Sequence, residues 1–167
     1  MTTGRARNKP RTYGIALRIP TRKALSFCPF GINGSPADRD NPVTAKLRRL
    51  AGFAPDDVVF LAGSTQDPEE AAALAAFLEL RGRWPQLRLA LVPRHPDRFA
   101  VVAKMLDQAA VPWQRRSELE TRGADPSARI LLVDTVGELG AWWGTARIAF
   151  VGGSFGSRGG QNMIEPA

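Results

Sequence analysis

The sequence predicts an α/β protein built on a doubly wound parallel sheet. Unbroken apolar runs of strand length, such as 58–62 and 130–133, are typical of strands buried on both faces. Segments of helical periodicity alternate with them over short connections, which is the pattern of a parallel sheet. The connections after the strands are rich in glycine and small polar residues, as expected of the ligand crevice at the carboxyl ends of such strands.

Composition narrows the class of protein. The 167 residues suffice for one domain with one core, and 44% are hydrophobic and 23% charged. The sequence contains no apolar stretch near the roughly 18–20 residues that span a bilayer, and no signal peptide. The single cysteine, Cys28, excludes an internal disulfide and a cysteine metal cluster, and it favours a reducing compartment.

The basic charge is confined to one segment. Residues 1–35 contain seven arginines and lysines and no acidic residue, so the whole net charge of +7 lies there. Such a tail could bind phosphate non-specifically. Residues 36–167 contain equal numbers of basic and acidic side chains and lack a basic face interleaved with aromatic residues. Nucleic-acid binding is therefore the weaker alternative.

The first predicted elements begin near residue 38, where the frequent prolines and glycines of the N-terminal segment give way to patterned sequence. Prolines and glycines interrupt every stretch of residues 1–42, so we expect residues 1–37 to be unstructured and residues 38–167 to form the folded unit. Residues 44–52 form an amphipathic helix with Leu47 and Leu50 on its apolar side.

The next unit reads as strand, loop and helix. Residues 58–62 are the strand and 63–66 the loop. Asp67 is a typical N-cap before a proline, and Glu70 completes a pattern like a capping box. The helix extends to about residue 83, and its apolar stripe comprises Leu74, Phe77, Leu78 and Trp84.

The remaining elements continue the alternation. Residues 87–92 are a strand, and 93–96 turn the chain into a helix whose apolar face includes Phe99, Val102, Ala103 and Leu106. Short strands follow at 113–116, 130–133 and 148–151. A short helix before the last strand contains Trp142 and Trp143, which we interpret as core residues.

A glycine-rich loop follows the last strand. Residues 152–160 form the loop, and 161–165 begin a helix. This strand–loop–helix arrangement points backbone N–H groups and a helix N-terminus at an anion. Glu165, in the first turn of that helix, is well placed to accept hydrogen bonds from two ribose hydroxyls.

The candidate ligand-binding residues lie in four loops: 63–66, 93–96, 134–138 and 152–162. Arg94 is the cation suited to a phosphate, although it could simply occupy a turn. The single histidine, His95, more commonly orders a loop, and Glu138 could merely stabilise a helix N-terminus. The sequence contains no paired carboxylates at catalytic spacing and no Ser/His/Asp or Cys/His set.

At these loops the sequence resembles the C-terminal half of 3-deoxy-D-manno-octulosonic acid (Kdo) transferase, which glycosylates lipid A. The matching runs occur in the family's order and spacing from about residue 38 to the end. They are residues 62–65 with Glu69 and Glu70, 93–99, 116–117, 134–139, 150–154 and 159–167.

The resemblance implies a GT-B glycosyltransferase, with this chain as a partial Rossmann-like C-terminal domain that holds the donor CMP-Kdo. Neither a metal ion nor another cofactor is implied. The residues implied to bind the donor nucleotide and its phosphate are Ser64, Arg94, Gly137, Glu138, Gly152, Gly153, Ser154, Asn162 and Glu165. Arg94 and residues 152–154 would face the phosphate, and Asn162 and Glu165 would hold the nucleotide end.

Two departures qualify this resemblance. Gln66 and Gln161 stand where the family usually has histidine, so both positions keep a hydrogen-bonding side chain but lose a titratable one. No part of the sequence matches the family's N-terminal domain, which carries the membrane anchor, the acceptor surface and the general base. We therefore expect a fragment truncated at both ends, with no catalytic residue and no activity alone.

The intact enzyme implied by the resemblance would act at the cytoplasmic face of the inner membrane, with a lipid A-type acceptor bound by the N-terminal domain. The fragment itself would be cytoplasmic, without a specific nucleic-acid partner. Two alternatives remain from the sequence. One is a GT-B enzyme that uses another nucleotide sugar. The other is a non-catalytic module that binds a nucleotide or anion and carries a basic tail.

Overall fold

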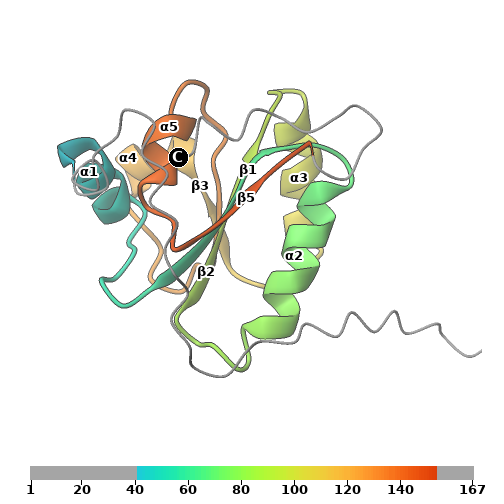
Figure 1. The fold of residues 1–167 in the computed structure, drawn as a ribbon, viewed down its shortest axis with the longest axis horizontal. Helices are drawn as coiled ribbons and strands as arrows, with labels where there is room; N and C mark the ends of the chain where they lie inside the picture. Colours follow the sequence, from blue (N-terminus) through green and yellow to red (C-terminus); the bar gives the residue numbers. More distant parts are fainter. Residues whose placement is uncertain (1–40, 154–167) are drawn as a thin grey trace, which may run out of the picture.

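A five-stranded parallel sheet organises the computed structural model, which describes residues 41–153 (Figure 1). The strand order is β3-β4-β2-β1-β5, and every neighbouring pair is parallel. The strands are β1 (Val58–Thr65), β2 (Leu87–Pro93), β3 (Trp113–Arg115), β4 (Ile130–Leu132) and β5 (Ile148–Val151). The predicted fold class is therefore confirmed.

Helices cover both faces of this sheet. They are α1 (Pro42–Leu50), α2 (Glu69–Leu80), α3 (Arg98–Asp107), the 3₁₀ turn η2 (Arg116–Glu118), α4 (Leu119–Arg122) and α5 (Leu139–Trp143). Figure 1 shows α2 and α3 together on one side, and α1, α4 and α5 on the other. This two-sided cover explains why the central strands are apolar at nearly every position.

Two hydrophobic clusters form the core, one on each face. Under α2 and α3, Phe77, Leu89 and Leu106 are almost fully buried. On the opposite face, Leu61 and Trp142 are fully buried among residues of α1, α4 and α5. Trp143 is 7% exposed, so both tryptophans are core residues as predicted.

Helix α1 begins at Pro42, two residues before the predicted start. Asn41 is the N-cap, and its side-chain oxygen accepts a 2.8 Å hydrogen bond from the Thr44 amide. Pro42 occupies the first turn, where its missing N–H has no cost. Leu47 is buried, as its place on the apolar side predicts.

The structure corrects the predicted start of α2. Asp67 is not the N-cap, because the cap position is Pro68 and no side chain caps it. Asp67 instead pairs with Arg98 at 3.3 Å, and Glu70 pairs with the same guanidinium at 3.1 Å. Glu69, rather than Glu70, reaches back to the preceding loop, where its Oε2 accepts from the Gln66 amide at 3.0 Å.

Two element boundaries also differ. The predicted loop 63–66 belongs largely to β1, which continues to Thr65 because its backbone still pairs with β2. The helix α2 ends at Leu80, so Trp84 is outside its apolar stripe. Trp84 is 44% exposed, with the Arg83 guanidinium carbon 5.8 Å from its ring centre.

Some expectations lie outside the described part of the chain. The predicted unstructured segment 1–37 is among them, as is the helix turn expected at 161–165. Within residues 41–153, no helix has the length and apolar character needed to cross a bilayer.

Candidate functional site

A pocket of about 250 Å³ opens at the carboxyl ends of β1, β2 and β4. It is lined by Ser64, Val92, Pro93, Arg94, Phe99, Thr135, Val136, Gly137, Leu139 and Gly140. Three of the predicted binding residues, Ser64, Arg94 and Gly137, therefore meet in one cavity although they come from three separate segments of the chain. This is the edge of a parallel sheet at which ligands bind in such folds.

The β1 side of the pocket depends on an irregularity in the strand. The register between β1 and β2 shifts between Gly63 and Thr65, and Ser64, which lies at the shift, has a φ of 57°. Gly63 itself is pressed against the core, because a Cβ there would collide with the Trp143 ring. A residue without a side chain is thus required directly beneath the pocket.

Arg94 supplies the positive charge of the pocket. Its backbone N–H donates to the Thr65 carbonyl at 3.0 Å, which joins the end of β2 to the end of β1. The side chain is exposed, and within residues 41–153 its guanidinium has no acidic partner. His95 beside it is also exposed and does not line the cavity.

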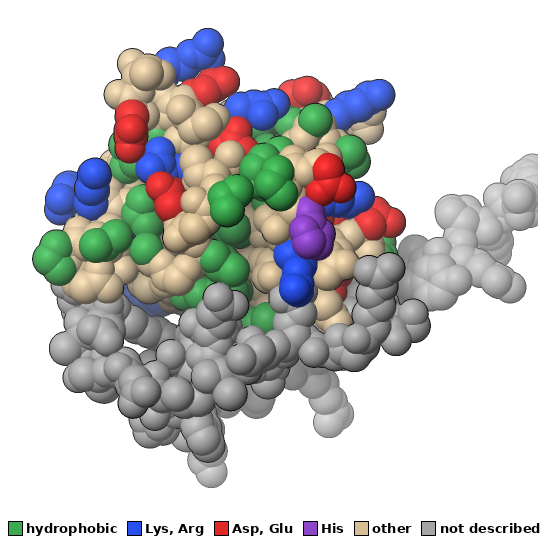
Figure 2. All heavy atoms as spheres, turned by 90° about the horizontal axis from the view of Figure 1, so that it is seen from above, with side chains coloured by type: hydrophobic (Ala, Val, Ile, Leu, Met, Phe, Trp, Pro, Cys, Tyr) green, Lys and Arg blue, Asp and Glu red, His purple; other side chains and the backbone are tan. Residues whose placement is uncertain are grey.

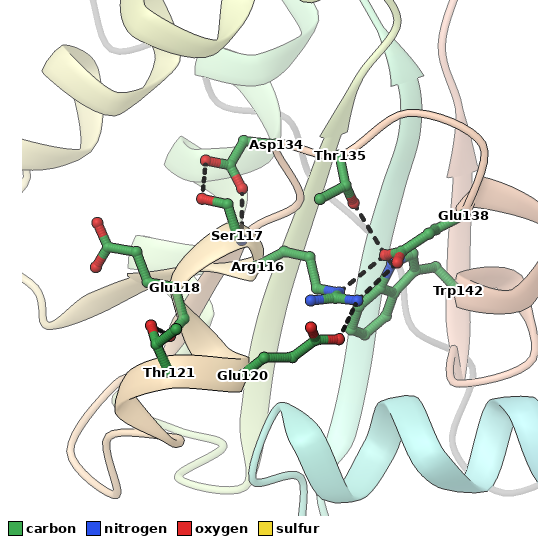
Figure 3. A network of polar contacts seen from close by, with 9 residues as sticks. All are labelled: Arg116, Ser117, Glu118, Glu120, Thr121, Asp134, Thr135, Glu138 and Trp142. Atoms are coloured by element: carbon green, nitrogen blue, oxygen red, sulfur yellow. Dashed lines mark hydrogen bonds and ion pairs between the residues drawn. The ribbon is translucent and has the colours of Figure 1, made fainter.

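The loop between β4 and α5 forms another wall. Gly137 has a φ of +88°, a left-handed conformation that favours glycine. Glu138 belongs to the same loop but is not part of the lining, because its carboxylate is engaged elsewhere. The Arg116 guanidinium donates to both of its oxygens, at 2.7 and 2.9 Å (Figure 3).

Two further donors complete the surroundings of Glu138. The Thr135 hydroxyl donates to Oε2 at 2.9 Å and the Trp142 indole N–H at 3.2 Å. Burial disfavours the charged carboxylate, but these hydrogen bonds and the Arg116 charge outweigh it, so the pKa of Glu138 lies below its usual value. Glu138 is therefore an ionised anchor of the loop.

At the end of β5, Gly152 and Gly153 approach β1 and α2. The Gly152 amide donates to the Gly63 carbonyl at 2.8 Å, and the Gly153 amide donates to Glu69 Oε2 at 2.9 Å. A Cβ on Gly152 would collide with the Ser64 carbonyl and lie 2.7 Å from the Glu69 carboxylate. The two predicted glycines are thus joined to the Ser64 segment. Ser154, Asn162 and Glu165 lie outside the described residues.

Sequence reasoning assigned no role to two residues that shape this site. Arg116 is buried and holds Glu138, and Glu69 is buried and holds the residues after β5. A charged residue next to an apolar strand or at a helix start is usually solvated, so only their partners, 22 and 84 residues away, reveal their function. Both residues did fall within the resembling runs, Glu69 with residues 62–65 and Arg116 in 116–117.

The site's chemistry is that of anion binding. Arg94 offers a planar fork of donors, and the glycines allow a ligand to approach the backbone closely. Among the described residues, no group of three or more His, Cys, Asp or Glu side chains could hold a metal ion. Figure 2 views this edge of the sheet and shows Lys and Arg interspersed with Asp and Glu on its visible part, not gathered into one basic face.

Comparisons with known proteins agree with the loop motifs. The chain is 40% identical over 111 residues to the 3-deoxy-D-manno-octulosonic acid transferase of Haemophilus influenzae, a match that covers 66% of the chain and 26% of that protein. The corresponding enzyme of Bordetella pertussis is 39% identical over 118 residues, covering 69% and 27%. No protein-family model matches the sequence.

A solved structure matches the fold as well as the sequence. The C-terminal CMP-Kdo binding domain of WaaA from Acinetobacter baumannii superposes with a TM-score of 0.65 and is 31% identical, over 74% of this chain and 63% of that one. The chain spans about a quarter of the length of the curated relatives it matches.

The fold and its pocket define an α/β domain of the type found in the C-terminal half of GT-B glycosyltransferases. Within that class, the chain is similar to the C-terminal half of Kdo transferases, which are glycosyltransferases. The resemblance predicted from the loop motifs is therefore confirmed.

Proposed function

We propose that this chain is the donor-binding part of a Kdo transferase and that its pocket binds CMP-Kdo. The observation that carries the proposal is the convergence of Ser64, Arg94 and Gly137 on one cavity. That cavity lies in a domain similar to one that is known to bind CMP-Kdo. In the intact enzyme, we propose, Kdo passes from CMP to a hydroxyl of a lipid A-type acceptor.

Arg94 is the residue proposed to stabilise the leaving group. As the bond between Kdo and CMP breaks, negative charge accumulates on the single phosphate of CMP. A guanidinium that makes no ion pair within residues 41–153 can receive that charge through two parallel hydrogen bonds. A donor fixed before the reaction stabilises such charge without reorganisation at the moment of transfer.

The acceptor side of the reaction is assigned to other parts of the enzyme. No residue of this chain is proposed as the base that deprotonates the acceptor hydroxyl, and we expect the chain alone to be inactive. The acceptor would be bound by the family's N-terminal domain, at the cytoplasmic face of the inner membrane.

Nucleotide binding to the full 167-residue chain tests the donor site. We expect calorimetric titration to show that CMP binds more tightly than UMP or UDP. Replacement of Arg94 by Ala should weaken CMP binding about ten- to a hundredfold, because it removes a charge-assisted hydrogen bond. Arg81→Ala, an exposed arginine outside the pocket, is the matched control.

The outcomes separate the alternatives. No CMP binding by the unaltered chain would overturn the donor-site proposal, and a preference for UDP or UMP would indicate another GT-B donor. Transfer is tested on the protein as expressed in its source cells. CMP should be released when both CMP-Kdo and a lipid A-type acceptor are present, and an absence of release would contradict the proposed reaction.

A further inference from the structure

The 3₁₀ turn η2 holds the pocket loop between β4 and α5 at both of its ends. We propose that η2 is a clamp that fixes the shape of this loop for the donor, with Arg116 and Ser117 as positioning residues. The inference rests on the proposed function for its ligand, but the clamp itself can be tested without one. Figure 3 shows the two arms, one from Arg116 to Glu138 and one from Ser117 to Asp134.

The first arm is a forked ion pair at the α5 end of the loop. Arg116 Nη2 lies 2.7 Å from Glu138 Oε1, and Nε lies 2.9 Å from Oε2. Nη2 also donates to Glu120 at 3.2 Å, which steadies the guanidinium from α4. Two parallel bonds fix the orientation of the carboxylate as well as its distance, which a lysine could not do.

The second arm is at the β4 end of the loop. The Ser117 backbone N–H donates to Asp134 Oδ1 at 2.9 Å, and its hydroxyl donates to Oδ2 at 2.8 Å. Arg115 Nη1 lies 3.5 Å from Oδ2 of the same carboxylate. Both oxygens of Asp134 are therefore held by Ser117 of η2, with Arg115 just before η2 as a further partner.

Between the arms lie three of the residues that line the pocket, Thr135, Val136 and Gly137. Val136 is 78% exposed, so no core packing holds it, and Gly137 adds backbone freedom. The Thr135 hydroxyl donates a 2.9 Å hydrogen bond to the clamped Glu138 carboxylate. The loop's shape thus depends on its two ends, and a loop ordered in advance binds its ligand at a lower entropic cost.

The position of η2 argues for a positioning function. Neither Arg116 nor Ser117 lines the cavity. Arg116 reaches a loop 22 residues later in the chain, where its guanidinium donates to both carboxylate oxygens of Glu138. Removing the fork should therefore loosen the loop before it unfolds the sheet.

Hydrogen exchange of the ligand-free chain tests the clamp directly. In Arg116→Lys, we expect the amides of residues 135–138 to exchange about tenfold faster, because the loop opens more often. Amides of β2 should be unchanged. Ser117→Ala is the milder second variant, and it should loosen the Asp134 end only. Arg122→Ala, which removes the exposed ion pair between α4 and Glu118 of η2 but no contact with the pocket loop, is the matched control. Unchanged loop exchange in both clamp variants would overturn the inference.

Trp142 provides a spectroscopic reading of the same arm. Its indole N–H donates to Glu138 Oε2, so its ¹H–¹⁵N resonance should move in Arg116→Lys and stay in place in the Arg122→Ala control. The resonance should also move when CMP is added to the unaltered chain. An indole resonance of Trp142 that has the same chemical shift in Arg116→Lys as in the unaltered chain would contradict the clamp.

CMP affinity connects the clamp to the donor. We expect Arg116→Lys to bind CMP about tenfold more weakly while its β2 amides remain protected. Combining it with Glu138→Gln should weaken binding little further, because both changes break one arm. Equal CMP binding by the unaltered chain and Arg116→Lys would overturn the clamp alone. No CMP binding by the unaltered chain would overturn the proposed function and the clamp's donor role together.

Discussion

The Glu69 carboxylate accepts a 2.9 Å hydrogen bond from the backbone amide of Gly153, which joins the first residue of α2 to the loop after β5. The same oxygen accepts from the Gln66 amide at 3.0 Å. Glu69 is 2% exposed, so this oxygen is shielded from water. One buried atom therefore holds together the loops that leave two neighbouring strands, β1 and β5.

Replacing Glu69 by Gln tests the strength of this junction. A neutral amide oxygen accepts more weakly than a carboxylate, so we expect the free energy of unfolding to fall by about 1–2 kcal/mol. The Gly153 amide should also exchange faster with solvent. Urea denaturation and hydrogen exchange measure the two effects. Glu79→Gln, an exposed position on the same helix, is the control. Equal losses in the two variants would argue against a special role for Glu69.

Gly152 should tolerate no side chain. An alanine Cβ would collide with the Ser64 carbonyl and approach the Glu69 carboxylate to 2.7 Å, and backbone cannot move aside cheaply. We expect Gly152→Ala to lower the free energy of unfolding by about 1–3 kcal/mol. Gly82→Ala adds a Cβ into open space and serves as the control in the same denaturation experiment. A Gly152→Ala protein as stable as the control would show that the contact is not as tight as described.

Gly63 in β1 should likewise tolerate no side chain, because it packs against α5. A Cβ there would enter the Trp143 ring and lie 2.9 Å from Leu139 Cδ1, displacing α5 from the sheet. Because Leu139 lines the pocket, Gly63→Ala should reduce both stability, by about 1–3 kcal/mol, and CMP affinity. Thermal unfolding and calorimetric titration measure the pair. Gly140→Ala, whose Cβ meets nothing within 4 Å, should change stability little.

The ion pair of Glu138 predicts a pH dependence of stability. Burial opposes ionisation, but hydrogen bonds from Arg116, Thr135 and Trp142 outweigh it, so the folded-state pKa lies below the ordinary value of 4.5. A depressed pKa means that the folded state favours the carboxylate. Its contribution is complete above the unfolded-state pKa and is lost as the pH falls through the folded-state pKa.

We therefore expect the difference in unfolding free energy between the unaltered chain and Glu138→Gln to be constant at neutral pH. The difference should shrink as the pH drops below about 4.5, where the unfolded chain begins to bind the proton. Urea denaturation across this range measures it. A difference that persists unchanged into strong acid would mean that the charge of Glu138 contributes nothing.

Local sequence patterns were sufficient to predict most of the sheet. Apolar runs such as 130–133 and 148–151 coincide with β4 and β5 within one residue, because a strand covered on both faces must be apolar along its length. The end of β1 was missed. Residues 63–65 look like a polar loop, yet their backbone continues the pairing with β2, which the residue types cannot report.

The pocket was predictable in part for a similar reason. Ser64 lies at the end of β1, Arg94 directly follows β2 and Gly137 lies in the loop after β4, so parallel topology alone brings them to one edge. The engagement of Glu138 by Arg116 was not predictable, because it depends on a side-chain contact between segments that are distant in sequence. The prediction that Asp67 caps α2 was wrong, because its carboxylate pairs with Arg98 instead. Arg98 lies 31 residues away, so the local sequence around Asp67 does not reveal this partner.

The two acids of the pocket loop each carry their own counter-ion, with Arg115 against Asp134 and Arg116 against Glu138. Their fields largely cancel at the cavity, so the sign of the local electrostatic potential is left to Arg94. A phosphate that approaches from solvent is then attracted and not repelled by the loop. The attraction should be felt over about 10 Å at 0.1 M salt and fade as ionic strength rises, so the same pairs that order the loop also make the entrance passable for an anion.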